Sequence, residues 1–182
     1  MVGLQIVTSG PDSSWEQIKN SYIRMILDAK EYVYIQTPYF IPDDSVLDAI
    51  RIASVSGVDV RVMIPDKPDH LFVYWATYSY VGEVLKAGAK VYLYGNGFLH
   101  AKTMVIDDCL ATVGTANIDV RSFRLNFEVN AIIYHENSAV NLRNTFEEDL
   151  MESIELTPEV YNNRTLYIRF KESISRLLSP VL

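Results

Sequence analysis

The chain has 182 residues, of which 49% are hydrophobic and 21% charged, and this composition excludes a largely disordered protein. The formal net charge of -7 argues against sequence-independent binding to nucleic acid, which depends on neutralising phosphates with basic side chains. A local basic site is compatible with this charge, because net charge does not determine the field inside one pocket. Cys109 is the single cysteine, so no disulfide forms within the chain, and its apolar neighbours predict that it is buried.

Strands and helices alternate along the first half of the sequence. Apolar residues three and four apart predict helices, runs of β-branched and aromatic residues predict strands, and Gly or Pro marks their ends. In chain order the sequence predicts a strand at 5–8, a helix at 15–30, a strand at 32–36, a helix from Asp43 or Asp44 to 56, a strand at 58–64, a helix at 69–87 and a strand at 90–94. This alternation predicts an α/β fold whose first part is a largely parallel sheet.

The second half of the sequence has a different pattern. After a turn at 95–97 it predicts strands at 99–106, 109–115 and 128–134, followed by helices near 138–153 and 164–178. No repeat, linker or low-complexity tract interrupts the chain, so we expect a single domain over residues 1–182. The expected architecture is a mixed β-sheet sandwiched between helices.

The chain as given shows no sequence signal for export or for membrane insertion. Its start lacks a basic segment followed by an apolar run, which is the pattern of a signal peptide. The longest apolar-rich window, residues 71–81, is shorter than the roughly 20 residues that span a bilayer. We therefore expect the chain as given to be soluble.

The most informative stretch is the predicted strand that contains His100 and Lys102. Strand residues two apart share a face, so these two side chains should project together. If residues 107–108 form a two-residue hairpin turn, His100 faces Thr115, and Asn117 joins the same face if the strand continues. The full set of cross-strand partners would be Ile106 with Cys109, Met104 with Ala111, Lys102 with Val113 and His100 with Thr115.

This patch has the chemistry of phosphodiester transfer. A neutral imidazole at His100 can attack phosphorus and form a phosphohistidine, while Lys102 and Asn117 hold the phosphate oxygens. Glu128 is the best candidate to orient the His100 ring through its second nitrogen. Asp107 has the wrong parity for this face, so we expect a structural or electrostatic role for it. No cluster of side chains has metal-ligand spacing, so we expect neither a metal nor another cofactor.

The same residues resemble the signature of the phospholipase D superfamily. His-x-Lys-x4-Asp begins at His100 and is followed by Gly114-Thr115-Ala116-Asn117 and Asn126-Phe127-Glu128. Thr115 stands where this pattern usually has Ser, and threonine keeps the hydroxyl group. We therefore count Thr115 among the substrate-binding residues. Four further segments resemble the C-terminal half of the bacterial cardiolipin synthase family, namely residues 36–44, 65–70, 121–128 and 177–182.

This resemblance implies a phospholipase D-like fold that joins two phosphatidylglycerols into cardiolipin and releases glycerol. Enzymes of this kind carry two copies of the motif, whose halves face each other, and they begin with membrane-spanning segments at the bacterial cytoplasmic membrane. The chain carries one copy, so its expected partner is the missing N-terminal half or a second copy in a homodimer, and not nucleic acid. A lipid hydrolase, a nuclease or a catalytically silent half are the alternatives.

Several other residues allow two interpretations. Tyr39 and Phe40 follow a strand, where they line a lipid cleft or pack in the core. Arg121 binds a second phosphate or headgroup, or it is a surface charge. His70 caps a helix or lines the substrate cleft. The aromatic helix that follows it packs in the core or faces lipid.

Overall fold

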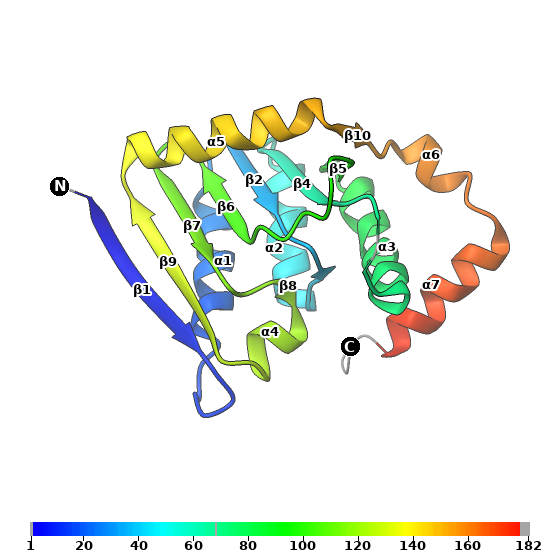
Figure 1. Cartoon of the computed structure of the whole chain (residues 1–182), viewed down its shortest axis with the longest axis horizontal. Helices are drawn as coiled ribbons and strands as arrows, with labels where there is room; N and C mark the ends of the chain where they lie inside the picture. The colour runs from blue at the N-terminus through cyan, green and yellow to red at the C-terminus, as the bar shows by residue number, and fades with distance from the viewer. Residues whose placement is uncertain (1, 68, 179–182) are drawn as a thin grey trace.

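A computed structural model describes residues 2–67 and 69–178 and shows one large sheet with helices on both faces (Figure 1). Within these residues the sheet has eight strands in the order β1-β9-β7-β6-β2-β4-β5-β10. They are β1 Gly3–Ser9, β2 Tyr32–Gln36, β4 Asp59–Pro65, β5 Lys90–Tyr94, β6 Thr103–Ile106, β7 Leu110–Gly114, β9 Glu128–Tyr134 and β10 Ser153–Glu155. The expected mixed sheet between helices is confirmed.

The helices and two short strands complete the fold. The helices are α1 Gln17–Asp28, α2 Asp44–Val55, α3 Leu71–Lys86, α4 Val120–Arg124, α5 Glu136–Met151, α6 Pro158–Asn162 and α7 Leu166–Leu178. The strands β3 Phe40–Ile41 and β8 Ile118–Asp119 pair in parallel with each other, apart from the large sheet. The sequence did not predict β3, β8, β10, α4 or α6, because strands of two or three residues and helices of five are too short to show a periodic pattern.

The predicted parallel region is confirmed. Strand β4 pairs in parallel with β2 on one side and with β5 on the other. Asp43 caps α2 as predicted, since its side chain accepts a hydrogen bond from the backbone N–H of Val46 at 3.1 Å. Gly57 follows that helix with a φ of +94°, which only glycine adopts without strain.

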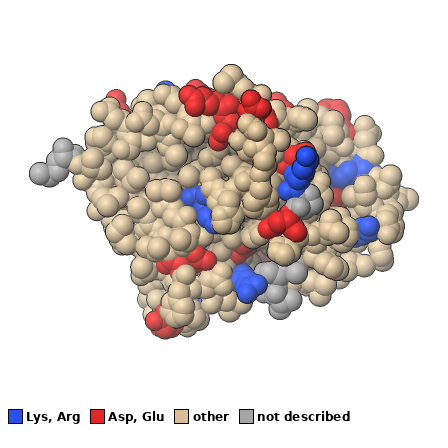
Figure 2. All heavy atoms as spheres, in the orientation of Figure 1, with Lys and Arg blue, Asp and Glu red and all other residues tan. Residues whose placement is uncertain are grey.

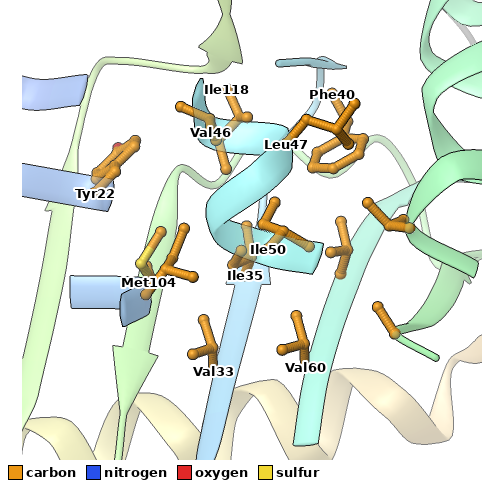
Figure 3. Close-up of a cluster of buried hydrophobic side chains, with 14 of the residues drawn as sticks. Tyr22, Val33, Ile35, Phe40, Val46, Leu47, Ile50, Val60, Met104 and Ile118 are labelled. Atoms are coloured by element: carbon orange, nitrogen blue, oxygen red, sulfur yellow. The ribbon is translucent and has the colours of Figure 1, made fainter. Parts of the chain in front are cut away.

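Two apolar layers hold the sheet between its helices. Helices α1 and α2 cover one face, where Val33 and Ile35 of β2 pack with Ile50 of α2 (Figure 3). Helix α5 covers the other face, where the ring of Tyr34 stacks on Phe146 with 4.8 Å between centroids. Strand β2 is buried on both faces, and this anchors the loop that leaves its C-terminal end.

The expected register of the β6–β7 hairpin is wrong by one residue. Asp107 and Asp108 both have positive φ values, and the Cys109 N–H donates to the Ile106 carbonyl at 3.1 Å. Cys109 therefore belongs to a three-residue turn and is exposed, which corrects the prediction that it is buried. The observed pairs are Ile106 with Leu110, Val105 with Ala111, Met104 with Thr112 and Thr103 with Val113.

The strand also begins later than expected. Strand β6 starts at Thr103, so His100 and Lys102 lie in the segment before it. The Lys102 carbonyl still accepts a hydrogen bond from the Gly114 N–H at 3.2 Å, which keeps this segment beside the end of β7. Strand alternation therefore does not determine where the side chains of His100 and Lys102 point.

The aromatic helix α3 packs in the core through its middle and is exposed at its first turn, while its contact with lipid stays a prediction. Ala76 and Val81 are fully buried in the core, whereas Leu71 and Phe72 at its first turn are 59% and 52% exposed. Helix α7 lies alongside α3 at one edge of the molecule (Figure 1). In the described part of the chain, no helix has both the length and the apolar content that crossing a membrane requires.

Candidate active site

Asp107 connects the hairpin turn to the start of β2. Its carboxylate accepts hydrogen bonds from three consecutive backbone N–H groups, those of Lys30 at 2.7 Å, Glu31 at 3.0 Å and Tyr32 at 2.9 Å. It lies at the opposite end of β6 from Lys102. These contacts agree with a structural role and separate Asp107 from the residues that could touch a substrate.

Lys102 lies in a partly buried position with acidic neighbours. Its ammonium donates to the His100 carbonyl at 2.8 Å. Burial lowers the pKa of Lys102, and the nearby carboxylates of Glu128 and Asp119 partly offset this shift. The three charged groups therefore lie within electrostatic range of one another. The His100 side chain is exposed, with its ring centroid 6.0 Å from that of Phe98.

A buried polar network positions the segment that carries Asn117. The Ala116 N–H donates to the Asn130 side-chain oxygen at 3.3 Å, and the Tyr22 hydroxyl donates to the Ala116 carbonyl at 3.2 Å. The Asn130 amide in turn donates to the Tyr22 oxygen at 2.8 Å. A Cβ atom at Gly114 would lie 2.3 Å from the Asn130 oxygen, so this close approach requires glycine. The network fixes the backbone immediately before Asn117.

Asp119 is a site residue that the sequence analysis missed. It is 6% exposed, and its side chain caps α4 by accepting a hydrogen bond from the Ser122 N–H at 2.6 Å. Burial raises the pKa of Asp119, while hydrogen bonds from Ser122 and the Asn117 side chain act against that shift. The Asp-x-x-Ser spacing of a helix cap was the signal that could have identified it.

The contact with Asp119 leaves Asn117 able to bind a ligand. The Asn117 side chain hydrogen-bonds to Asp119, and the Asn117 backbone N–H donates to the Ser122 hydroxyl at 3.3 Å. A carboxamide nitrogen carries two N–H donors, so one is left after the bond to Asp119. Asp119 therefore orients Asn117 without using its full donor capacity.

Thr115 and Glu128 lie where the end of β7 meets the start of β9. The Val129 N–H donates to the Thr115 hydroxyl at 2.9 Å, which joins the end of β7 to β9. The Asn126 side-chain amide donates to the Glu128 carboxylate at 3.1 Å. Asn126 therefore orients Glu128, a role that the sequence analysis did not assign to it.

A cavity of about 210 Å³ opens beside Asn117. It is lined by Tyr39, Ile41, His70, Val73, Asn117, Asp119, Arg121 and Asn126. Tyr39, Asn117 and Arg121 were expected at the site, and the structure brings all three together here. His70 also lines the cavity, from the residue that precedes α3, which agrees with the cleft interpretation of this residue.

Tyr39 and Phe40 have different surroundings although they are consecutive. The Tyr39 hydroxyl donates to the Asp69 carboxylate, and burial together with this bond raises the pKa of Tyr39 to about 12. Phe40 is 0% exposed and packs in the core beside Leu47 (Figure 3). Its backbone N–H donates to the Thr77 hydroxyl at 3.3 Å. The expectation that Phe40 contacts substrate is therefore corrected, since its ring has no path to the cleft.

Comparison with protein families and curated sequences gives close matches over the whole chain. A family model described as "Cardiolipin synthase, PLD-like domain" matches residues 22–150. The major cardiolipin synthase of Bacillus subtilis is 68% identical over 181 residues, which cover 100% of this chain and 38% of that protein. The cardiolipin synthase of Oceanobacillus iheyensis is 62% identical with the same coverage. The chain thus spans well under half the length of the curated relatives that it matches.

Solved structures show the same fold at low sequence identity. A phosphatidylserine synthase of Haemophilus influenzae aligns over 100% of this chain and 48% of its own, with a TM-score of 0.79 and 16% identity. The phospholipase D family member Nuc of Salmonella typhimurium aligns over 86% of this chain and 99% of its own, with a TM-score of 0.72 and 16% identity. At this identity the likeness concerns the fold alone.

Proposed function

Because this chain belongs to the family of phospholipase D-like domains of cardiolipin synthase, we propose that it supplies half of the active site of a bacterial phosphatidyltransferase. The enzyme joins two phosphatidylglycerol molecules into cardiolipin and releases glycerol. Identity of 68% to a protein named for this activity supports the proposal. Residues 1–182 act as one domain, the C-terminal half of an enzyme at the cytoplasmic membrane.

His100 is the nucleophile in the first step of the reaction. One imidazole nitrogen attacks the phosphorus of phosphatidylglycerol, the new P–N bond forms, and the bond from phosphorus to the headgroup glycerol oxygen breaks. The glycerol leaves after taking a proton from a general acid. The exposure of His100 supports this role, since a lipid phosphate must reach the ring.

The second step returns the enzyme to its starting state. A headgroup hydroxyl of a second phosphatidylglycerol attacks the phosphohistidine, the P–O bond of cardiolipin forms and the P–N bond breaks. The attacking hydroxyl gives its proton to the group that served as acid in the first step. An alcohol leaves in the first step and another enters in the second, and the same acid–base side chain serves both. A second motif would supply that side chain.

The observation that carries the proposal is the group formed by Lys102, Glu128, Asp119 and Asn117. Lys102 supplies positive charge for the phosphate oxygens, and the free N–H of Asn117 supplies a neutral donor. Glu128, held by Asn126, is the carboxylate for the second ring nitrogen of His100. Tyr39, Thr115 and Arg121 contact the lipid headgroups around this centre.

The general acid comes from outside the single motif of this chain. A missing N-terminal half with its own motif supplies it, or a second copy of the chain does so in a homodimer. The two arrangements differ when wild-type chains are mixed with a His100→Ala variant. In a homodimer with a shared site, mixed pairs lose activity beyond simple dilution, whereas linear loss contradicts such a site.

The test is mass spectrometry of lipid products from phosphatidylglycerol, run with and without the N-terminal half of a cardiolipin synthase. We expect cardiolipin and glycerol in equal amounts only when the second motif is present. His100→Ala should abolish the product, while His135→Ala, a change at the residue before α5, should not. Phosphatidic acid as the main product would identify a hydrolase and contradict the proposal.

A further inference from the structure

Helix α7 presents its apolar face outward and its polar face toward the protein. Glu172 and Ser175 are the buried residues of this helix, at 4% and 1% exposure. Leu166, Phe170 and Leu177 are 81%, 63% and 81% exposed. Surface helices of globular proteins normally have the opposite arrangement, with the apolar stripe on the core.

In the described part of the chain, charged side chains make the specific contacts of the inward face. Arg164 forms an ion pair with Glu172 at 2.7 Å. The Arg176 guanidinium lies over the Tyr80 ring of α3 at 4.6 Å and within 3.5 Å of the Glu83 carboxylate. The Arg176 contacts turn this polar face of α7 toward α3, which leaves the apolar side chains on the opposite face exposed.

Apart from Ile168, which is 37% exposed, the exposed apolar residues of α7 form one continuous stripe. At 100° per residue, positions 166, 170 and 177 fall within one narrow sector, directly opposite the sector of positions 172 and 175. The whole stripe consists of Leu166, Tyr167, Phe170, Ile174, Leu177 and Leu178. An apolar surface of this extent on one helix indicates a partner that is itself apolar.

Basic side chains border the stripe. Arg169 and Lys171 lie on opposite edges of it. Residues 164–178 contain four basic side chains and one acidic one, so this segment is positively charged although the chain has a net charge of -7. Figure 2 shows this side of the molecule, over α7, as mostly uncharged surface with basic side chains beside it, while acidic side chains gather over the C-terminal part of α5. A cationic border around an apolar stripe matches a membrane with anionic headgroups.

From this arrangement we infer that α7 lies in the interface of an anionic phospholipid bilayer, with its outward stripe among the acyl chains. The apolar surface continues onto α3, where Lys171 lies over the Trp75 ring at 4.5 Å and Trp75 contacts Phe72 edge to face. Phe72 follows His70, which lines the cavity of the candidate site. The bilayer surface would thus lead to that cavity, so a lipid headgroup could enter it while its acyl chains stay in the membrane.

The inference goes beyond the proposed function and is tested without turnover. The 182-residue chain is floated with vesicles of phosphatidylcholine and phosphatidylserine in equal parts, which contain none of the proposed substrate. We expect flotation, and a fall in the partition coefficient of at least about tenfold in Leu166→Ser/Phe170→Ser/Leu177→Ser. The matched control Leu27→Ser/Ile52→Ser/Val55→Ser changes exposed apolar residues on α1 and α2 and should float like the wild type.

The electrostatic part of the inference has its own variant. Arg169→Gln removes one border charge, and within residues 69–178 the Arg169 side chain makes no ion pair with α3, so the helix should keep its orientation. We expect binding to phosphatidylserine vesicles to fall about fivefold at low salt, as one cation near the surface predicts. Binding to phosphatidylcholine alone should not change.

A labelled cysteine reports the position of the stripe even if a serine variant is unstable. Phe170→Cys in a Cys109→Ser background carries a polarity-sensitive fluorophore, because the native thiol is exposed and would react. Its emission should shift to the blue with phosphatidylserine vesicles, and the same label at Met151→Cys on α5 should not shift.

Three results would overturn the inference. The first is a wild-type chain that does not float, or an α7 triple variant that floats unchanged. The second is a concentration-dependent dimer of the wild-type chain that the α7 triple variant does not form, because the stripe would then bind a second copy. The third is vesicle binding that disappears when the N-terminal half is added, since the stripe would then be covered by that half.

Discussion

The two ends of the β6–β7 hairpin use polar residues of one motif in different ways. At the turn, Asp107 accepts three backbone hydrogen bonds and holds the hairpin to β2. At the open end, Lys102 is partly buried, and the nearby carboxylates of Glu128 and Asp119 partly offset the effect of burial on its pKa. Both ends lie on the same two strands, within a few residues of each other.

From this difference we infer that the motif combines a structural residue with residues that are available to a ligand. Satisfied polar groups such as Asp107 contribute to stability, because their hydrogen bonds are complete in the folded chain. Groups with unused donors, such as Lys102 and Asn117, are available to a ligand. Substitutions at the turn should therefore change the free energy of unfolding, and substitutions at the open end should change activity.

The most severe loss of activity is expected for His100→Ala. Loss of a nucleophile typically lowers kcat by about 10⁴-fold or more. Because the side chain is exposed, the free energy of unfolding should change by less than about 0.5 kcal/mol. Cardiolipin formation in the enzyme with both motifs and urea unfolding of the chain measure the two effects. A large loss of stability would instead indicate that His100 has a structural role, like Asp107.

Gly114→Ala should give the greatest loss of stability, because it disturbs the network that positions the open end. A Cβ at this position would lie 2.3 Å from the Asn130 oxygen and 2.4 Å from the Val129 carbonyl. We expect a loss of about 3 kcal/mol in urea unfolding, typical of overpacking. As a control, Gly88→Ala has free space around it but a φ of +94°, so it should cost about 1 kcal/mol. Equal losses would contradict the close contact.

Asp107→Ala should lower stability by about 2 kcal/mol, since it removes a carboxylate that accepts three N–H groups, two of them at exposed positions. Asp107→Asn keeps one acceptor oxygen and tolerates a positive φ, so its loss should be about half as large. Thermal unfolding measures both variants. Unchanged stability together with abolished activity would instead place Asp107 in the catalytic centre.

The smallest effect concerns the pH dependence of Lys102. Burial lowers its pKa, so the folded enzyme loses this proton at a lower pH than the unfolded chain does. The kcat/KM value should therefore fall as pH rises through a pKa below 10.5, the ordinary value for lysine. In Lys102→Arg the alkaline fall should vanish while some activity remains. An unchanged alkaline limb in that variant would exclude Lys102 as its source.

Much of the architecture was predictable from local pattern. The strands at 32–36, 90–94 and 128–134 have the predicted bounds, because runs of β-branched and aromatic residues mark buried strands. The residues of the candidate site were named from a motif, whereas their predicted arrangement depended on a hairpin register that is wrong. Register depends on turn geometry, and Asp107 and Asp108 both adopt positive φ in a turn of three residues.

Other features had no local signal. The cap spacing of Asp119 marks a helix start but not its burial beside Asn117, which arises because β8 pairs with β3, some 80 positions earlier in the chain. Phe40 and Tyr39 look alike in sequence, but one packs in the core and the other lines a cavity. The outward stripe of α7 also depends on which face the ion pairs hold inward.

The sequence by itself determines the order of the main strands and helices, the capped helix ends and the identity of the motif. Each of these depends on residues that are close to one another in the chain. The hairpin register, the acidic neighbours of Lys102, the burial of Phe40 and the orientation of α7 come from contacts between distant segments. Such contacts depend on the summed packing and charge of many residues, which no local pattern encodes.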